Sequence, residues 1–204
     1  MLEARQLACM RGDRLLFSEI DLHLEAGGLL HVRGPNGSGK SSLLRMLCGL
    51  ILPEAGDITW QGQNIRKNED YFRSLTYLGH QNGIKEELSA IENLRITCGL
   101  AGFDIDERTA FDALERIGLE GREALPAKVL SQGQRRRVML ARLLVAETPL
   151  WILDEPLVAL DTDAIGFMRS LFELHLEKGG MMILTTHQEL EIAALTTREI
   201  RFNS

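Results

Sequence analysis

The sequence predicts an α/β fold with a mixed-sheet core, an antiparallel β region at the N-terminus and a helical insertion. First, a strand-like stretch, Leu29–Val32, runs directly into a glycine-rich loop and then into a helical pattern. Second, two compact apolar segments, Leu150–Leu153 and Met181–Thr185, have the length of buried strands and flank a helical stretch at about 163–178. Third, apolar residues between about 89 and 144 recur at three- or four-residue spacings, which is typical of packed helices.

The N-terminal region predicts antiparallel sheet. Residues 1 to about 33 alternate polar and apolar between Gly-Asp and Gly-Gly breaks, and Gly56–Gly62 continues the pattern. Leu75–Gly79 predicts a further strand. In the second half of the chain, a helix at about 163–178 between two apolar strands predicts a right-handed parallel crossover.

Composition limits the class of protein. With 204 residues and 45% hydrophobic content, the chain can bury one sizeable core, and its net charge of −6 disfavours a nucleic-acid binder. No apolar run approaches the ~20 residues of a membrane-spanning helix, and the N-terminus lacks the uninterrupted apolar core of a signal peptide. Cys9, Cys48 and Cys98 are widely spaced and predict buried, reduced thiols.

The glycine-rich loop fits the pattern G-x-x-x-x-G-K-[ST] at every fixed position and predicts a site for a nucleoside triphosphate with Mg²⁺. Its glycines allow backbone N–H groups to curl around phosphate oxygens, and the following helix N-terminus adds a favourable dipole. Lys40 is expected to reach the β- and γ-phosphates, and the Ser41 hydroxyl to bind the metal. The residues assigned to nucleotide binding here are Gly34, Pro35, Asn36, Gly37, Ser38, Gly39, Lys40, Ser41 and Ser42.

Two carboxylates end the apolar strand at 150–153. Ligands bind at the carboxyl ends of parallel strands, so a charge that first appears there indicates a site. Asp154 is predicted to hold Mg²⁺ through water. Glu155 is predicted to accept a proton from the attacking water or to orient it.

The segment Leu130–Gln134 predicts a second anion site. Ser131 can cap a helix over about 134–144, and the N–H groups around Gly133 are free to face an anion. Gln134 is assigned to nucleotide binding with them.

These elements, in this order, resemble the ATP-binding-cassette (ABC) ATPases. The phosphate loop, Gln81, an LS-x-GQ signature, a hydrophobic-DE strand, an LD pair and His187 follow one another over essentially the whole chain. The resemblance implies a P-loop NTPase of ABC type with a RecA-like core. It implies one ABC domain over 1–204, with a catalytic core of about 1–85 and 145–204 and a helical subdomain of about 86–144.

The resemblance also implies a role for each matching residue. Gln81 would sense Mg²⁺ and the γ-phosphate, and His187 would hydrogen-bond the γ-phosphate. Ser131 and Gly133 would contact the γ-phosphate held by a second subunit, and Asp161 would lie across that dimer interface. The other four histidines are expected to be structural.

Three positions depart from the family pattern. Gln132 replaces the first glycine of the signature, and Val158 stands where the family often has serine. Arg11 falls where an adenine-stacking aromatic is expected; a guanidinium can also stack on a base. Phe17 is expected to serve core packing instead. The run Arg135–Arg137 is interpreted as a helix surface with one phosphate-proximal member.

In this family two cassettes sandwich the nucleotide, so we expect ATP to favour a homodimer and the isolated chain to be a weak ATPase. The short C-terminus carries no fused membrane segment, which leads us to expect a separate membrane subunit. The segment Gly79–Lys85 is well placed to grip it.

Several stretches more closely resemble the haem-exporter cassettes of cytochrome c maturation. They are Gly79–Lys85, Leu88–Leu94, Leu150–Pro156 and Ile183–Gln188. This implies a CcmB-like integral membrane subunit and CcmC-, CcmD- and CcmE-like partners. ATP hydrolysis would drive haem loading or release of the haem chaperone from the cytoplasmic face of the bacterial inner membrane, where the chain would be peripheral. The sequence has no CxxCH haem motif.

Three alternatives stay open at this point. The chain could serve an exporter of another substrate. A soluble ABC ATPase of translation or DNA repair would need a tandem cassette or coiled-coil insertions, and a catalytically silent scaffold is disfavoured by Lys40, Asp154, Glu155 and His187.

Overall fold

The computed structural model describes residues 1–81, 83–188 and 190–202, and backbone contacts divide the chain into two compact units. The first, called the sheet unit, comprises Met1–Tyr77, Thr148–Glu155 and the chain from Phe172 onward. The second, called the helical unit, comprises Leu78–Glu147 and Pro156–Leu171. Each unit is described by itself.

An antiparallel sheet forms one layer of the sheet unit, with the strand order β2-β1-β4-β5. Its strands are β1 (Leu2–Arg11), β2 (Arg14–Leu24), β4 (Ala55–Trp60) and β5 (Gln63–Asn64). In β1 a register shift surrounds Gln6, whose φ is 51°. The shift moves burial from even to odd positions, so that Leu7 and Cys9 are buried as Leu2 and Ala4 are. The bulge therefore keeps one face of a long, twisted strand on the core.

A parallel sheet forms the second layer, with the order β6-β7-β8-β3-β9. Its strands are β3 (Gly28–Arg33), β6 (Leu75–Leu78), β7 (Leu150–Asp154), β8 (Met181–Thr185) and β9 (Thr196–Arg201). β7 and β8 are buried at every position, which explains their uninterrupted apolar sequence. The carboxyl ends of β7 and β8 lie next to each other, and the carboxyl end of β3 lies beside that of β8.

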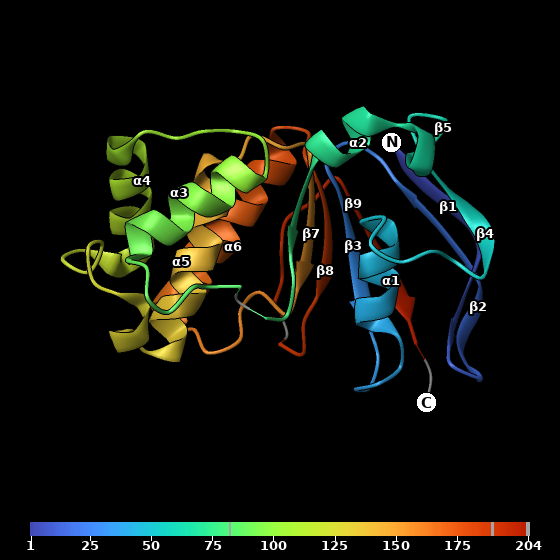
Figure 1. Ribbon diagram of the computed structural model, residues 1–204. Coiled ribbons are helices and arrows are strands. Elements are labelled where there is room, and N and C mark those ends of the chain that lie inside the picture. The colour runs from blue at the N-terminus through green and yellow to red at the C-terminus, as the bar shows by residue number, and fades with distance from the viewer. Residues whose placement is uncertain (82, 189, 203–204) are drawn as a thin grey trace. The chain divides into compact units, whose positions relative to one another are not determined.

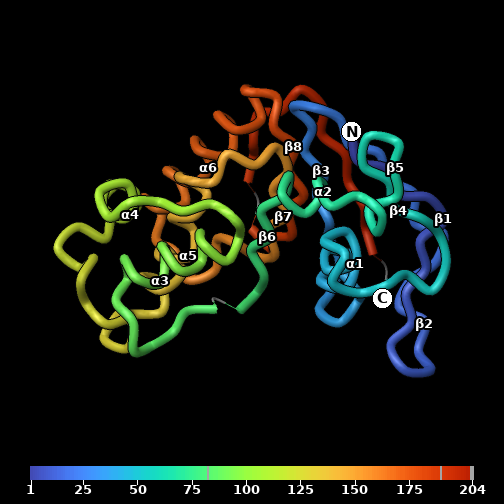
Figure 2. Tube along the Cα trace, turned by 45° about the horizontal axis from the view of Figure 1, so that its top comes forward, coloured from blue at the N-terminus to red at the C-terminus, as the bar shows by residue number. Residues whose placement is uncertain are grey.

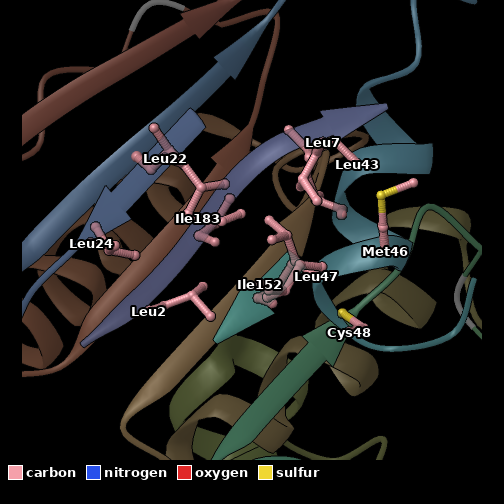
Figure 3. Close-up of a cluster of buried hydrophobic side chains, with 14 of the residues drawn as sticks. Leu2, Leu7, Leu22, Leu24, Leu43, Met46, Leu47, Cys48, Ile152 and Ile183 are labelled. Atoms are coloured by element: carbon pink, nitrogen blue, oxygen red, sulfur yellow. The ribbon is translucent and has the colours of Figure 1, made fainter. Parts of the chain in front are cut away.

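Helix α1 (Lys40–Leu47) lies between the two sheets (Figure 1). Its buried leucine and methionine side chains meet residues of both layers in one core (Figure 3). The short helices Ile65–Lys67 and α2 (Glu69–Arg73) follow β5. From α2, the buried Tyr71 donates a 2.5 Å hydrogen bond to the carbonyl oxygen of Leu47 and so ties the two helices together.

The helical unit contains α3 (Ala90–Leu100), α4 (Glu107–Leu114), the π-helix Glu115–Leu119, the 3₁₀ turn Ala127–Val129 and α5 (Gln132–Val145). α3, α4 and α5 pack against one another (Figure 2). Side chains fix where each begins: Ser89 forms a capping box with Glu92, and Asp106 accepts from the Thr109 N–H. Helix α6 (Thr162–Glu177) begins in the helical unit and ends in the sheet unit.

The structure confirms the predicted fold class and differs from the prediction in detail. Helix α5 begins at Gln132, two residues earlier than predicted, because Gln134 is the third helical residue and completes the capping box of Ser131. Strand β9 was missed, since an exposed polar edge strand has no apolar run to reveal it. All three cysteines are buried and free, as predicted, and burial raises the pKa of the Cys98 thiol to about 11. Among the described residues, no helix combines the length and apolar character needed to cross a bilayer.

Candidate functional site

The phosphate loop joins β3 to α1 in the sheet unit, and two of its glycines leave no room for a side chain. Gly34 has a φ of 149°, and a Cβ there would lie 2.8 Å from Cβ of Phe202. Gly39 has a φ of 106°, and a Cβ there would lie 2.9 Å from Cδ1 of Phe17. Gly37, at φ 80°, faces open space. The side chains of Phe202 and Phe17 thus lie directly against the loop, and glycine is needed at both positions, Gly34 and Gly39.

Lys40 lies inside this loop. Its side chain is buried, and its ammonium group donates to the carbonyl oxygens of Gly34 (2.7 Å) and Pro35 (3.0 Å). The N-terminus of α1 has no side-chain cap, and the buried Ser38 hydroxyl has no hydrogen-bond partner within the described residues. A compact loop with an ammonium group, an uncapped helix N-terminus and an orphaned hydroxyl fits an anion such as a phosphate.

The carboxylates of Asp154 and Glu155 follow the end of β7, and Thr185 at the end of β8 links them. Asp154 and Thr185 are register partners in the parallel sheet. The Thr185 hydroxyl donates to Oδ1 of Asp154 (2.7 Å) and accepts from the Glu155 N–H (2.9 Å). One buried hydroxyl therefore orients both residues. The prediction from sequence missed Thr185, although a polar residue at the end of an apolar strand was a signal that could have found it.

Glu155 adopts an unusual backbone conformation. Its φ is 51°, which costs a non-glycine residue on the order of 1–3 kcal/mol unless the surroundings hold it. Its N–H also donates to the Thr185 carbonyl oxygen at 3.2 Å, which helps to hold the turn. The carboxylate Oε1 lies 3.4 Å from Nε2 of His187, whose side chain is 57% exposed. The structure thus brings together the predicted base and the predicted γ-phosphate sensor.

We expect Thr185→Val to lower the free energy of unfolding by about 1–3 kcal/mol, because Asp154 and the Glu155 N–H each lose a buried hydrogen bond. Valine keeps the shape of threonine, so cavity formation contributes little. Urea titration measures the effect, and Thr197→Val on exposed β9 is the matched control, with an expected change within ~0.5 kcal/mol. Equal values for the two variants would contradict this role.

The signature segment lies in the helical unit, at the N-terminus of α5. Ser131 and Gln134 exchange hydrogen bonds: the Gln134 N–H donates to the Ser131 hydroxyl (3.2 Å), and the Ser131 N–H donates to Oε1 of Gln134 (2.9 Å). A Cβ on Gly133 would lie 2.5 Å from the carbonyl oxygen of Ala159. Gly133 is therefore required for packing against the segment that leads to Asp161. Gln132 is exposed at the first helical position.

Asp161 lies at the start of α6, in the same unit. One carboxylate oxygen accepts from the Ala164 N–H at 2.9 Å and so caps the helix. The other pairs with the guanidinium of Arg137 from α5, which also donates to the carbonyl oxygens of Ile117 and Gly118 (both 3.3 Å). Asp161 is still 62% exposed.

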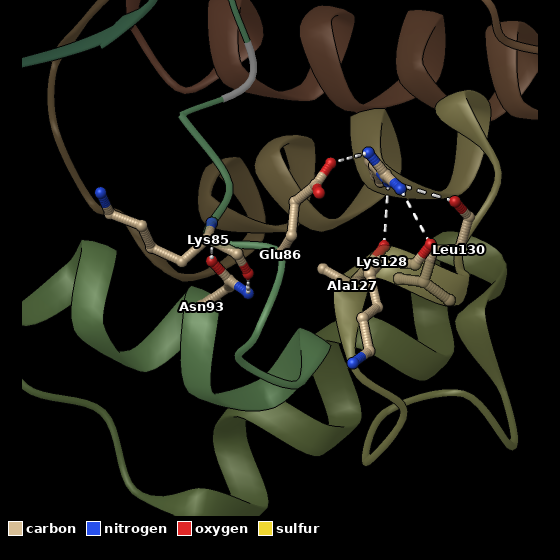
Figure 4. Close-up of polar contacts among 7 residues, drawn as sticks. Lys85, Glu86, Asn93, Ala127, Lys128 and Leu130 are labelled. Carbon is tan, nitrogen blue, oxygen red and sulfur yellow. Dashed lines mark hydrogen bonds and ion pairs between the residues drawn. The ribbon is translucent and has the colours of Figure 1, made fainter.

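The interpretation of Arg135–Arg137 as a helix surface is wrong. Arg135 donates to the carbonyl oxygens of Ala127, Lys128 and Leu130 and pairs with Glu86 at 2.5 Å (Figure 4). Arg136 is 3% exposed, and Arg137 makes the contacts just described. Each guanidinium donates to acceptors within the helical unit, because the three residues lie on different faces of α5 and those faces meet different loops. The three residues thus have structural partners that no helical periodicity could predict.

The remaining predicted residues lie as follows. Gln81 is exposed and belongs to the helical unit. Arg11 is exposed and is the register partner of Arg14 at the end of the β1–β2 hairpin. Burial raises the pKa of the Cys9 thiol, and a hydrogen bond with the Ser42 side chain opposes this rise. Phe17 is buried and packs on Phe202 with ring centroids 5.2 Å apart, which confirms its core role.

The oxygen atoms of Asp154 and Ser41 suit a metal ion that also takes a phosphate as a ligand. Among residues 1–81, 83–188 and 190–202, no group of three or more histidine, cysteine or acidic side chains is arranged to hold a metal ion. Mg²⁺ needs no such cage, since it is commonly held by one or two carboxylates together with substrate phosphates and water. Asp154 at the end of β7 and the Ser41 hydroxyl beside the phosphate loop are donors of the right chemistry.

The fold and these motifs define a nucleotide-binding cassette, and comparison with known proteins agrees. The family model for the ABC transporter matches residues 17–158, and the chain belongs to this family. The predicted family is thereby confirmed.

Its curated relatives carry a more specific name. The chain is 61% identical over 201 residues to the cytochrome c biogenesis ATP-binding export protein CcmA of Nitrosospira multiformis, with 98% of each chain covered. It is 59% identical to the protein of the same name from Nitrosomonas europaea, covering 98% of this chain and 94% of that one. A solved structure described as an ABC transporter ATP-binding protein from Pyrococcus furiosus is 28% identical, with a TM-score of 0.83 over 97% of this chain and 96% of that chain.

Proposed function

We propose that this chain is the ATP-hydrolysing motor subunit of a cytochrome c maturation haem exporter. The observation that carries the proposal is the 61% identity, over nearly the full length of both chains, to a CcmA protein. The phosphate loop, Asp154, Glu155 and His187 are all in place, so the chain has the groups that ATP hydrolysis requires. This chain therefore acts as an enzyme and not as a silent scaffold.

The chain's own residues divide the work of hydrolysis. The loop N–H groups and Lys40 bind the β- and γ-phosphates. To do so, the ammonium group of Lys40 gives up its hydrogen bonds to the carbonyl oxygens of Gly34 and Pro35. Glu155 orients the attacking water and takes its proton, while His187 faces the γ-phosphate from the end of β8. Ser41, Asp154 and Gln81 would hold Mg²⁺, which would neutralise negative charge on the phosphates.

A second copy of the chain completes the site. Ser131, Gly133 and Gln134 offer an α5 N-terminus to the γ-phosphate of the partner subunit, and Asp161 remains largely exposed for the interface. The electrostatic stabilisation of the transition state is then supplied from two chains. ATP therefore drives homodimer formation, and hydrolysis releases it.

The motor acts on a membrane protein. A CcmB-like integral subunit anchors it at the cytoplasmic face of the inner membrane, with CcmC-, CcmD- and CcmE-like proteins in the same assembly. Each turnover supplies the work for loading haem onto the haem chaperone or for releasing that chaperone.

The test is complementation of a bacterium that lacks its own haem-exporter cassette. The wild-type chain is expected to restore c-type cytochromes, measured by haem staining after denaturing electrophoresis, and to co-purify with the CcmB-like subunit. The Lys40→Ala variant, expressed to the same level, is the control and is expected to restore neither. Active ATP hydrolysis without recovery of c-type cytochromes would favour an exporter of another substrate.

A further inference from the structure

Arg136 has a set of contacts that the signature pattern does not explain. It lies on α5 between two arginines with exposed partners, yet its own side chain is buried, with 3% of the residue exposed. Its Nε donates to the carbonyl oxygen of Pro156 at 3.0 Å. One terminal nitrogen donates to the carbonyl oxygens of Gly79 (3.3 Å) and His80 (3.4 Å) and contacts Sδ of Met139 at 3.7 Å.

A buried guanidinium is tolerated only where acceptors replace its lost hydration. Here several acceptors are backbone carbonyl oxygens from two segments that are far apart in sequence. A planar guanidinium with five N–H donors can bridge such separate carbonyls, whereas the ammonium group of lysine is a single point charge on a flexible stem. The contacts therefore depend on the shape of arginine and not only on its charge.

The two bridged segments are the places where the chain enters the helical unit. The first entry is at Leu78, directly before Gly79 and His80, and the second is at Pro156. Each entry adjoins a residue proposed for hydrolysis, because Gln81 follows His80 and Glu155 precedes Pro156. The carbonyl oxygens of Pro156, Gly79 and His80 that Arg136 contacts belong to the helical unit, as Arg136 does.

We propose that Arg136 is a positioning residue for ATP hydrolysis, which fixes the backbone beside Gln81 and the backbone beside Glu155 with one side chain. The inference rests on the proposed function. Without the bridge, each segment can shift separately, and a misplacement of about 1 Å can lower a rate by about 10²-fold. ATP binding depends on the phosphate loop in the other unit and is expected to change little.

The test compares Arg136→Lys with Arg108→Lys in the whole chain. For Arg136→Lys, kcat is expected to fall at least ~10-fold while the dissociation constant for ATP stays within ~2-fold, since positioning and not binding is lost. Arg108→Lys makes the same chemical change at an exposed position of α4 in the same unit and is expected to leave kcat within ~2-fold. If Arg136→Lys fails to fold, Arg136→Gln, which keeps an N–H₂ donor, replaces it.

A double-mutant cycle separates positioning from a merely structural role. In a Gln81→Ala background, Arg136→Lys is expected to lower kcat by a smaller factor than in the wild-type chain, because one of the two groups whose backbone it holds is already gone. Arg108→Lys should leave kcat unchanged in either background. Full multiplication of the two losses, or a normal kcat for Arg136→Lys, would overturn the inference. A wild-type chain that does not hydrolyse ATP would instead overturn the proposed function.

Discussion

Glu155→Gln is expected to lower the rate of ATP hydrolysis by about 10²–10⁴-fold, the usual contribution of a general base. Glutamine keeps the size of the side chain and the hydrogen bonds of its backbone N–H to Thr185, so the turn with φ 51° should survive. It cannot take a proton from water. Because the phosphate loop is untouched, ATP should still bind, and the ATP-bound dimer should accumulate since hydrolysis no longer releases it.

Two measurements check this result. Steady-state phosphate release gives the rate, and size-exclusion chromatography with ATP and Mg²⁺ gives the dimer fraction. Glu54→Gln, at an exposed site in the sheet unit, is the matched control and should behave as wild type in both. Wild-type turnover in the Glu155→Gln variant would remove Glu155 from the mechanism.

Lys40→Ala is expected to weaken ATP binding by at least ~100-fold, or about 2.7 kcal/mol. The substitution removes the charge that meets the β- and γ-phosphates, and hydrogen bonds to charged groups contribute about 1.5–3 kcal/mol each. It also removes the two hydrogen bonds that connect α1 to the carbonyl oxygens of Gly34 and Pro35, so the loop loses an internal support.

Titration calorimetry with ATP and Mg²⁺ measures this loss directly. Lys178→Ala, at the exposed end of α6, changes the net charge equally and should leave the affinity unaltered. A dissociation constant for Lys40→Ala within a few-fold of wild type would exclude the assigned role.

The phosphate loop and the paired carboxylates could be predicted because their signals are local. Glycines at fixed spacing before Lys40, and charges that first appear at the end of an apolar strand, place a site at one edge of a parallel sheet. Lys40, Asp154, Glu155 and His187 all belong to the sheet unit, and Oε1 of Glu155 lies 3.4 Å from Nε2 of His187. The signature was equally local, since Ser131 and Gln134 are three residues apart and form their capping box within one turn.

Other features depend on partners that only folding supplies. Thr185 links Asp154 to Glu155 because the register of β7 and β8 sets those residues opposite each other. Arg136 is buried because α5 turns that position toward Gly79, His80 and Pro156. β9 pairs with the edge of β3; its two threonines and Ile200 suit a strand, but they form no apolar run that would reveal it.

The chain alone thus determined the class of protein, the chemistry of the nucleotide site and the alternation of strands and helices. These follow from short spacings and from the periods of 2 and 3.6 residues that each element imposes. Only the tertiary structure decided which side chains contact the backbone at Glu155 and beside Gln81. Strand register and helix rotation determine those contacts between distant segments, and neither can be predicted from residues that are neighbours in the sequence.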